Sequence, residues 1–306
     1  MILNKKRTPH LIVILGPTAS GKTALAIAVA KALNGEIISA DSRQVYRNMD
    51  IGTGKDLDLY DGVQHHLIDI CEPGEHYHVA RFEHDYREAL ETVIQSGRQP
   101  ILCGGSGLYL QAAISGLAYS GVPVSPARRT ALETLPHDKL TELLTAFPLP
   151  PGFSADTSTK KRVIRAIEIA EWWQAGPAIP ARAMPSIPAY IFGINPPVDE
   201  RRKRITQRLQ QRLDNGLIDE VRELLGSGVS PEQLIRYGLE YKYITEYLQD
   251  MLDADTLFAG LNTAIHRYAK RQMTYFRKME KDGLKINWLP HGPTTEMVKT
   301  VLAIYA

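Results

Sequence analysis

The sequence GPTASGKT constrains the fold of this chain more than any other stretch. It occupies residues 16–23, directly after the apolar run Leu11–Leu15 and before a stretch without Gly or Pro that lasts until Gly35. The Gly-x-x-x-x-Gly-Lys-Thr spacing between a strand-like run and a helix-like run predicts a P-loop. Backbone N–H groups of such a loop bind phosphate oxygens, its Lys adds a positive charge, and its Thr offers a hydroxyl to Mg²⁺. The predicted phosphate-binding residues are Gly16, Pro17, Thr18, Ala19, Ser20, Gly21, Lys22 and Thr23.

Apolar runs rich in branched residues alternate with helix-like stretches in the first part of the chain. This alternation predicts an α/β fold, a parallel sheet wound with helices. The loops that follow the strands should converge, because ligands of such sheets bind at the carboxyl ends of the strands. The strand-like runs are 11–15, 36–40 and 100–104, the helix-like stretches are 22–33 and 79–96, and the loops are 16–23, 41–46 and 104–109.

The domain organisation follows from a change of amino-acid composition near residue 116. Residues 1–115 form the first part of the P-loop core. Ten prolines and a basic helical segment at 159–173 set residues 116–188 apart, and we expect an inserted, mainly helical subdomain there. The strand-like run 189–194 should rejoin the sheet, so that residues 189–306 complete the core and add a helical C-terminal region.

Composition narrows the class of protein. With 44% hydrophobic and 23% charged residues, the chain belongs with ordinary globular proteins. Two cysteines without metal-ligand spacing, and an N-terminus without a signal-peptide core, indicate a cytoplasmic protein that does not contact membranes. We expect a monomer, because no long heptad run is present. The net charge is only +2, but seven Lys or Arg gather between Arg267 and Lys285, which suits nucleic acid.

The loop after the second strand-like run carries the best-placed acid, Asp41. Its position allows it to hold a metal, to accept a proton from a nucleophile, or simply to cap the next turn. Ser106 in the third loop could bond a ligand, although the glycines around it could equally serve a strand-to-helix turn. His65 and His66 look like a metal set, but neighbouring residues of a strand point apart, so we expect a structural or substrate-loop role instead.

Seven stretches, in this order, resemble the tRNA dimethylallyltransferases, also called tRNA isopentenyltransferases. The resemblance runs from about Leu11 to Leu289, and its second and last stretches are the most specific. The stretches are GPTASGKT, ADSRQVYRNMDIGTGK, HHLIDI, GGSGLYLQAAISGL, RVIRAIEI, RITQRLQQRLDNGLIDEVRELL and AKRQMTYFRK.

The resemblance implies that the P-loop holds the diphosphate of dimethylallyl diphosphate, so that the phosphate is a leaving group. The implied acceptor is N6 of the adenine 3′ of the anticodon, in tRNAs that read codons beginning with U. The implied catalytic residues are Lys22, Thr23 with Mg²⁺ on its hydroxyl, Asp41 as the base, and Arg208 on the leaving group. The implied contacts to the tRNA anticodon stem-loop are Asp41, Ser42, Arg43, Gln44, Ser106, Arg129, Arg162, Arg165, Lys270, Arg271, Gln272 and Arg277.

Three other functions stay open at this point. A related enzyme class prenylates free adenine nucleotides, but it would not need the basic stretch 267–285. A P-loop small-molecule kinase would use ATP, yet no second strand ends in a clear Mg²⁺-holding acid. A non-catalytic RNA-binding module would not need Lys22, Thr23 and Asp41 in one crevice.

Overall fold

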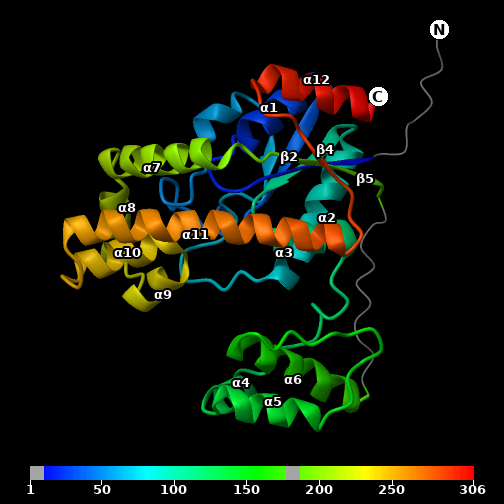
Figure 1. Ribbon diagram of the computed structural model, residues 1–306, viewed down its shortest axis with the longest axis vertical. Coiled ribbons are helices and arrows are strands. Elements are labelled where there is room, and N and C mark those ends of the chain that lie inside the picture. The colour runs from blue at the N-terminus through cyan, green and yellow to red at the C-terminus, as the bar shows by residue number, and fades with distance from the viewer. Residues whose placement is uncertain (1–9, 177–186) are drawn as a thin grey trace. The chain divides into compact units, whose positions relative to one another are not determined.

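The computed structural model describes residues 10–176 and 187–306. The chain divides into two compact units, one built from Met1–Ser115 and Pro185–Ala306 and the other from Gly116–Met184. Each unit is described by itself below. Figure 1 shows the elements of both, coloured along the chain.

A six-stranded, wholly parallel sheet forms the centre of the first unit, in the order β3-β2-β4-β1-β5-β6. The central strand β1 is buried along its whole length and pairs with β4 on one side and β5 on the other. The run at 189–194 therefore rejoins the sheet, as its pattern predicts. The strands are β1 (Leu11–Leu15), β2 (Gly35–Ala40), β3 (His65–His66), β4 (Gln99–Gly104), β5 (Ala189–Gly193) and β6 (Ile286–Trp288).

Helices cover both faces of this sheet, with α1 and α12 on one side and α2 and α3 on the other (Figure 1). Ile12, Ile14 and Phe192 point toward α1 and join its apolar residues in one core. The helix α1 ends at Asn34, whose left-handed φ of 51° stops the helix while its N–H still donates to the carbonyl of Ala30. These helices are α1 (Lys22–Leu33), α2 (Val79–Gln95), α3 (Gly107–Ser115) and α12 (Thr294–Tyr305), and a short 3₁₀ helix, η1, spans Leu57–Tyr60.

Five further helices of the first unit follow β5. The amphipathic stretch 199–225 is broken at Gly216, which has a φ of 95° and separates two helices. Asp253 caps the longest helix, α11, by accepting the N–H of Thr256 at 2.7 Å. The five are α7 (Val198–Asp214), α8 (Leu217–Gly226), α9 (Pro231–Arg236), α10 (Leu239–Leu248) and α11 (Ala254–Lys281).

The second unit is helical, as the sequence predicts for the insert. Leu132, Leu140, Val163 and Ile167 are buried together and form its own small core. Its helices are α4 (Pro126–Glu133), α5 (His137–Thr145) and α6 (Lys160–Gln174). Among the described residues of the whole chain, no helix combines the length and the apolar character that a bilayer span requires.

Candidate active site

The three loops at the carboxyl ends of β1, β2 and β4 meet, as predicted. The N–H of Ser42, after β2, donates to Oγ of Ser106, after β4, at 3.2 Å. The N–H of Ser106 in turn donates to the carbonyl of Ala40 at 3.4 Å. A Cβ at Gly105 would lie 3.3 Å from the carbonyl oxygen of Gly16, so the P-loop packs closely on the third loop. Gly105 has no left-handed φ, and a Cβ there would overlap Nε2 of Gln272, so this glycine leaves room for the Gln272 amide.

The P-loop has the backbone expected of a phosphate cradle. Ala19 and Gly21 adopt left-handed φ values of 60° and 88°, and α1 begins directly after Gly21. The N–H of Thr18 donates to Oε1 of Gln272 in α11 at 2.8 Å, and Nε2 of Gln272 donates to the carbonyl of Gly105 at 2.9 Å. Gln272 thus bridges two loops with both ends of its amide, and its predicted contact to tRNA stays a prediction.

A cavity of about 400 Å³ opens beside these loops within the first unit. Residues of α7, α9, α10 and α11 line it, tyrosines and arginines among them. Of the predicted site residues, the structure brings together in its lining Thr18, Lys22, Thr23, Asp41, Ser42, Arg43, Gln44, Arg208, Arg271 and Gln272. The cavity therefore holds the whole predicted catalytic set.

Two cations of this cavity lie in an environment that favours an anionic ligand. Burial lowers the pKa of Lys22, and the charge of Arg208 lowers it further while Asp41 raises it. Burial together with Arg212 lowers the pKa of Arg208 to about 10, so its guanidinium still carries a charge at neutral pH. Behind Lys22, burial raises the pKa of Cys103 to about 11, so this thiol is neutral. Lys22 and Arg208 are thus two partly desolvated positive charges, for which an anion is the matching partner.

Asp41 does two things at once in this structure. Its Oδ1 accepts the N–H of Arg43 at 2.9 Å, which is the capping role that its position allows. The same side chain also lines the cavity that contains Lys22 and Thr23. Capping therefore fixes the carboxylate at the cavity wall, and the geometry leaves it available to act on a ligand.

Gln44 is the residue that holds the next loop in place. Its Oε1 accepts the hydroxyl of Ser39 at 2.9 Å, and its Nε2 donates to the carbonyl of Gly54 at 3.1 Å. The hydrogen bond to Gly54 thereby holds the segment Gly52–Gly54 in the lining of the cavity. The side chain of Gln44 is already used within the protein, and its contact to a nucleotide stays a prediction.

Of the basic residues of α11, Arg271 lines the cavity, whereas Lys270 and Arg277 are exposed outside its lining. The Arg271 guanidinium lies 5.8 Å from the centre of the Tyr268 ring. Burial, followed by the charge of Asp41, raises the pKa of Tyr268, so this phenol stays protonated. An aromatic ring and an arginine together offer a flat surface to a base.

Three predicted residues belong to the second unit and lie outside the cavity. The Arg129 guanidinium binds the buried carboxylate of Glu168 through two hydrogen bonds of 2.9 and 2.7 Å. Arg165 donates to the same carboxylate at 3.1 Å and to two backbone carbonyls. Arg162 is 58% exposed and pairs with Asp156 at 2.8 Å. Arg129 and Arg165 thus stabilise this unit, while Arg162 is the most accessible of the three.

The structure adds functional candidates that the sequence reasoning missed. Glu220 of α8 accepts three backbone N–H groups, those of Asp50, Ile51 and Gly52, at 2.6 to 3.0 Å, and also the hydroxyl of Tyr241 at 2.7 Å. This carboxylate anchors the loop that Gln44 holds from the other side. The contacts join residues about 170 positions apart, so no local pattern could have indicated them.

Arg212 is a second missed residue. It lies one helical turn after Arg208 on α7 and lines the same cavity. The spacing of the two arginines was the signal, because residues four apart share one face of a helix.

The structure also shows the surroundings of the neighbouring residues His65 and His66. Nε2 of His66 lies 2.7 Å from Oε2 of Glu36, whereas the ring of His65 is tilted by 55° against that of Tyr60, with 4.7 Å between the ring centres. The two side chains have different surroundings, in keeping with the expected structural role. Within the described ranges, the one group of three potential metal ligands lies elsewhere and comprises His84, Asp85 and Glu88.

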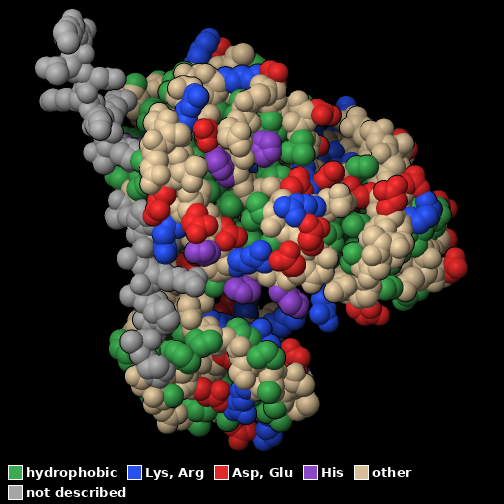
Figure 2. All heavy atoms as spheres, turned by 180° about the vertical axis from the view of Figure 1, so that it is seen from behind, with side chains coloured by type: hydrophobic (Ala, Val, Ile, Leu, Met, Phe, Trp, Pro, Cys, Tyr) green, Lys and Arg blue, Asp and Glu red, His purple; other side chains and the backbone are tan. Residues whose placement is uncertain are grey.

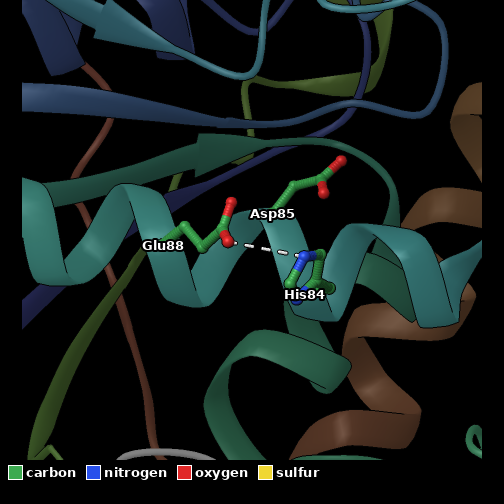
Figure 3. A group of neighbouring side chains, drawn as sticks. All are labelled: His84, Asp85 and Glu88. Atoms are coloured by element: carbon green, nitrogen blue, oxygen red, sulfur yellow. Dashed lines mark ion pairs between the residues drawn. The ribbon is translucent and has the colours of Figure 1, made fainter.

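That group lies on α2, where His84 and Glu88 are exposed and the side chain of Asp85, which points away from them in Figure 3, is 20% exposed. Nε2 of His84 pairs with Glu88 at 3.4 Å, and Arg81 lies 3.9 Å from Asp85. Asp85 and Glu88 therefore each have a partner on the same helix, and we assign no metal to the group. On the face drawn in Figure 2, basic and acidic side chains are likewise interspersed, in keeping with the net charge of +2.

The fold and the site together define a P-loop enzyme that acts on a phosphorylated substrate. The P-loop lies at the carboxyl edge of a parallel sheet, and Lys22, Arg208 and Asp41 line one cavity there. An acid placed beside two cations suits a reaction in which one substrate loses phosphate and another loses a proton.

Comparison with known proteins identifies the family. The model described as IPP transferase matches residues 44–279, and the model described as Isopentenyl transferase matches residues 9–62. A relative from Bacteroides fragilis, tRNA dimethylallyltransferase 2, is 48% identical over 283 residues, which cover 91% of this chain and 92% of the relative.

Two solved bacterial structures are similar over nearly the whole chain. The tRNA isopentenylpyrophosphate transferase of Bacillus halodurans gives a TM-score of 0.71 at 32% identity and covers 97% of this chain and 95% of its own. The tRNA delta(2)-isopentenylpyrophosphate transferase of Staphylococcus epidermidis gives 0.70 at 30% identity, with coverages of 97% and 98%. The chain belongs to the tRNA dimethylallyltransferase family, and both the resemblance and the α/β P-loop fold with its helical insert and C-terminal helices are confirmed.

Proposed function

We propose that this chain transfers the dimethylallyl group of dimethylallyl diphosphate to N6 of the adenine 3′ of the anticodon, in tRNAs that read codons beginning with U. The observation that carries the proposal is the joint presence of Lys22, Arg208 and Asp41 in one cavity. The C1–O bond of the donor breaks, the C1–N6 bond forms, diphosphate leaves with the bonding electrons, and one proton is released from N6.

The P-loop end of the cavity binds the donor. The backbone N–H groups at the start of α1 and the charges of Lys22 and Arg208 face the leaving oxygens, where negative charge grows as the C1–O bond breaks. Because the allylic carbon shares its developing positive charge with its double bond, stabilising the leaving group is the main requirement. The partial desolvation of both cations strengthens this effect.

The oxygen ligands in the cavity fit Mg²⁺. The hydroxyl of Thr23 and the carboxylates of Asp41 and Asp56 line the same space, and hard oxygen donors of this kind are what Mg²⁺ prefers. We propose Thr23 as its protein ligand. When bound there, Mg²⁺ neutralises charge on the diphosphate. Lys22 and Arg208 orient the same group from the protein side.

Asp41 is the proposed base for the adenine that accepts the dimethylallyl group. The lone pair of adenine N6 is delocalised into the ring, so the amino group attacks only if its proton can be taken up as the C–N bond forms. The Asp41 carboxylate, fixed by the Arg43 N–H, is placed to accept it. Tyr268 and Arg271 line the same cavity and suit a base that has left the stack of the anticodon loop.

The remaining tRNA contacts are proposed from charge and exposure. Lys270 and Arg277 are exposed on α11, and Arg162 is exposed on α6, so each can reach a phosphate of the anticodon stem-loop. Ser42, Arg43, Gln44, Ser106, Gln272, Arg129 and Arg165 complete the proposed set. For Arg129 and Arg165 the role is to order the helical insert through Glu168 as well as to offer charge.

One experiment tests the proposal against its alternatives. The protein is incubated with labelled dimethylallyl diphosphate and either unmodified tRNA or AMP, with ATP hydrolysis followed in parallel. We expect label on tRNA. Label on AMP alone would favour a nucleotide-prenylating enzyme, and ATP consumption without label on either would favour a kinase.

A further inference from the structure

We propose that Arg212 binds the diphosphate of the donor together with Arg208, as a second guanidinium on the leaving group. This assignment rests on the function proposed above. It concerns a residue that lies outside the P-loop and to which the family resemblance assigns no role. Four features of the cavity wall support it.

Gly54 leaves the space that Arg212 occupies. Its φ of +63° is left-handed, and a Cβ built on it would overlap guanidinium nitrogens of both Arg212 and Arg208. Any side chain at this position would therefore push at least one guanidinium away. The bare backbone of Gly54 lets two positive groups of α7 approach the loop that borders the cavity.

The two guanidiniums lie close together although they repel each other. Arg212 is among the charges that depress the pKa of Arg208. Glu240 lies 3.5 Å from Arg212, but burial raises the pKa of this carboxyl and works against its charged form. Asp56, Glu240 and Asp41 act on Arg208 in the opposite direction, yet its pKa stays lowered, so these two adjacent guanidiniums still favour further negative charge.

One end of Arg212 has no protein partner. Its Nη1 reaches the carbonyl of Gly52 at 3.4 Å, whereas its Nη2 is buried and makes no hydrogen bond to any residue that the structure describes. The whole side chain is only 12% exposed. A buried charged N–H without an acceptor is costly, so a ligand oxygen is the expected partner.

Arg212 also reaches the P-loop side of the site. Besides lining the main cavity with Lys22, it borders a smaller hollow together with Thr18, Ala19 and Arg208. A diphosphate held by the P-loop therefore has Arg208 and Arg212 on the face opposite the loop. Charge that develops on its oxygens as the C1–O bond breaks is then stabilised by both.

The first test removes the guanidinium charge and keeps an unbranched side chain. Arg212→Met is compared with Arg222→Met, a control on α8 whose arginine pairs with Asp219 outside the cavity. We expect Arg212→Met to weaken binding of inorganic diphosphate, measured by calorimetry, by roughly 10- to 100-fold, the range for a lost charged hydrogen bond. The KM for dimethylallyl diphosphate should rise in parallel, while that for tRNA stays within a few-fold. Unchanged diphosphate binding in a folded Arg212→Met protein overturns the assignment.

The second test uses the space at Gly54. Gly54→Ala is strained by its φ in any background, so the informative quantity is the coupling between the two positions. We expect Gly54→Ala to weaken diphosphate binding strongly in the natural chain and at least ~3-fold less in the Arg212→Met background, because one of the two displaced groups is then absent. Strictly additive effects contradict a shared role.

The outcome separates this assignment from the proposed function. If the natural protein binds diphosphate and Lys22→Ala weakens that binding while Arg212→Met does not, the function stands and the role of Arg212 is wrong. If the natural protein binds no diphosphate and prenylates no tRNA, the proposed function itself fails. Thermal melting of each variant shows whether it is folded.

Discussion

Gln272 of α11 accepts a hydrogen bond of 2.8 Å from the N–H of Thr18, so a helix near the C-terminus fixes the P-loop near the N-terminus. Its Nε2 also donates to the carbonyl of Gly105. We expect Gln272→Leu to leave both buried groups without a partner and to lower the free energy of unfolding by about 1–3 kcal/mol. The KM for dimethylallyl diphosphate should rise because the P-loop is less well ordered. Chemical denaturation and steady-state kinetics measure the two effects.

Gln207→Leu is the control for this prediction, because Gln207 is exposed on α7 and does not line the cavity. Equal stability of the two variants, together with an unchanged KM in Gln272→Leu, would mean that the bridge through Gln272 does not order the P-loop.

The leaving-group cations give a second prediction. Lys22→Ala and Arg208→Ala should reduce the use of dimethylallyl diphosphate severely and leave tRNA affinity nearly unchanged, because both side chains lie at the P-loop end of the cavity. Filter binding of tRNA and the kcat/KM for the donor separate the two substrates. A comparable loss of tRNA binding in Arg208→Ala would place Arg208 on the RNA side instead.

The pKa of Arg208 makes donor binding sensitive to alkaline pH. Burial and Arg212 lower this pKa to about 10, and the pKa of Lys22 is lowered in the same direction. Both groups bind the diphosphate as cations, so binding is intact below these pKa values and is lost as pH rises through them. The kcat/KM for dimethylallyl diphosphate should therefore fall as pH approaches about 10, earlier than an ordinary arginine would allow. A profile that stays flat to pH 10.5 in a folded protein argues against a role for both cations.

The basic side of α11 decides whether a large RNA is the acceptor. We expect the double variant Arg271→Ala, Arg277→Ala to bind tRNA more weakly and to bind inorganic diphosphate as tightly as the natural protein does. Each lost phosphate contact should flatten the slope of log K against log[salt] by roughly 0.7 to 0.9. Binding isotherms at several salt concentrations measure this slope. Natural affinity with the natural slope would show that these exposed arginines are only a solvated helix face.

Asp41→Ala tests the base. The substitution removes the carboxylate that the Arg43 N–H fixes at the cavity wall, so the proton on N6 has no acceptor. We expect a single-turnover rate at least ~100-fold lower, with diphosphate binding retained. A rate within a few-fold of the natural enzyme would exclude Asp41 from proton transfer.

The parts of this site that residue spacing alone predicts are local in the chain, whereas Arg208 and Arg271 were named from the family resemblance. The P-loop, its strand and its helix lie within a few residues of one another, and their spacing determines their geometry. The convergence of three loops follows from parallel strands alone. Glu220 and Gly52 are 168 residues apart, and only the packing of α8 and α10 brings this carboxylate to the loop.

The outer strand β6 was not predicted from the sequence. It has three residues, which is too few for an alternating pattern to stand out. The space at Gly54 could not be predicted from the sequence either, since the sequence shows a glycine but not the two arginines of α7 that lie next to it.

The most direct test of the account is a single-turnover reaction of labelled dimethylallyl diphosphate with unmodified tRNA, followed by digestion to nucleosides and mass spectrometry. The account predicts that the label appears on N6 of one adenosine, the nucleotide 3′ of the anticodon, with one diphosphate released for each prenyl group transferred. Label on another nucleoside, or diphosphate released without a prenylated adenosine, would contradict it.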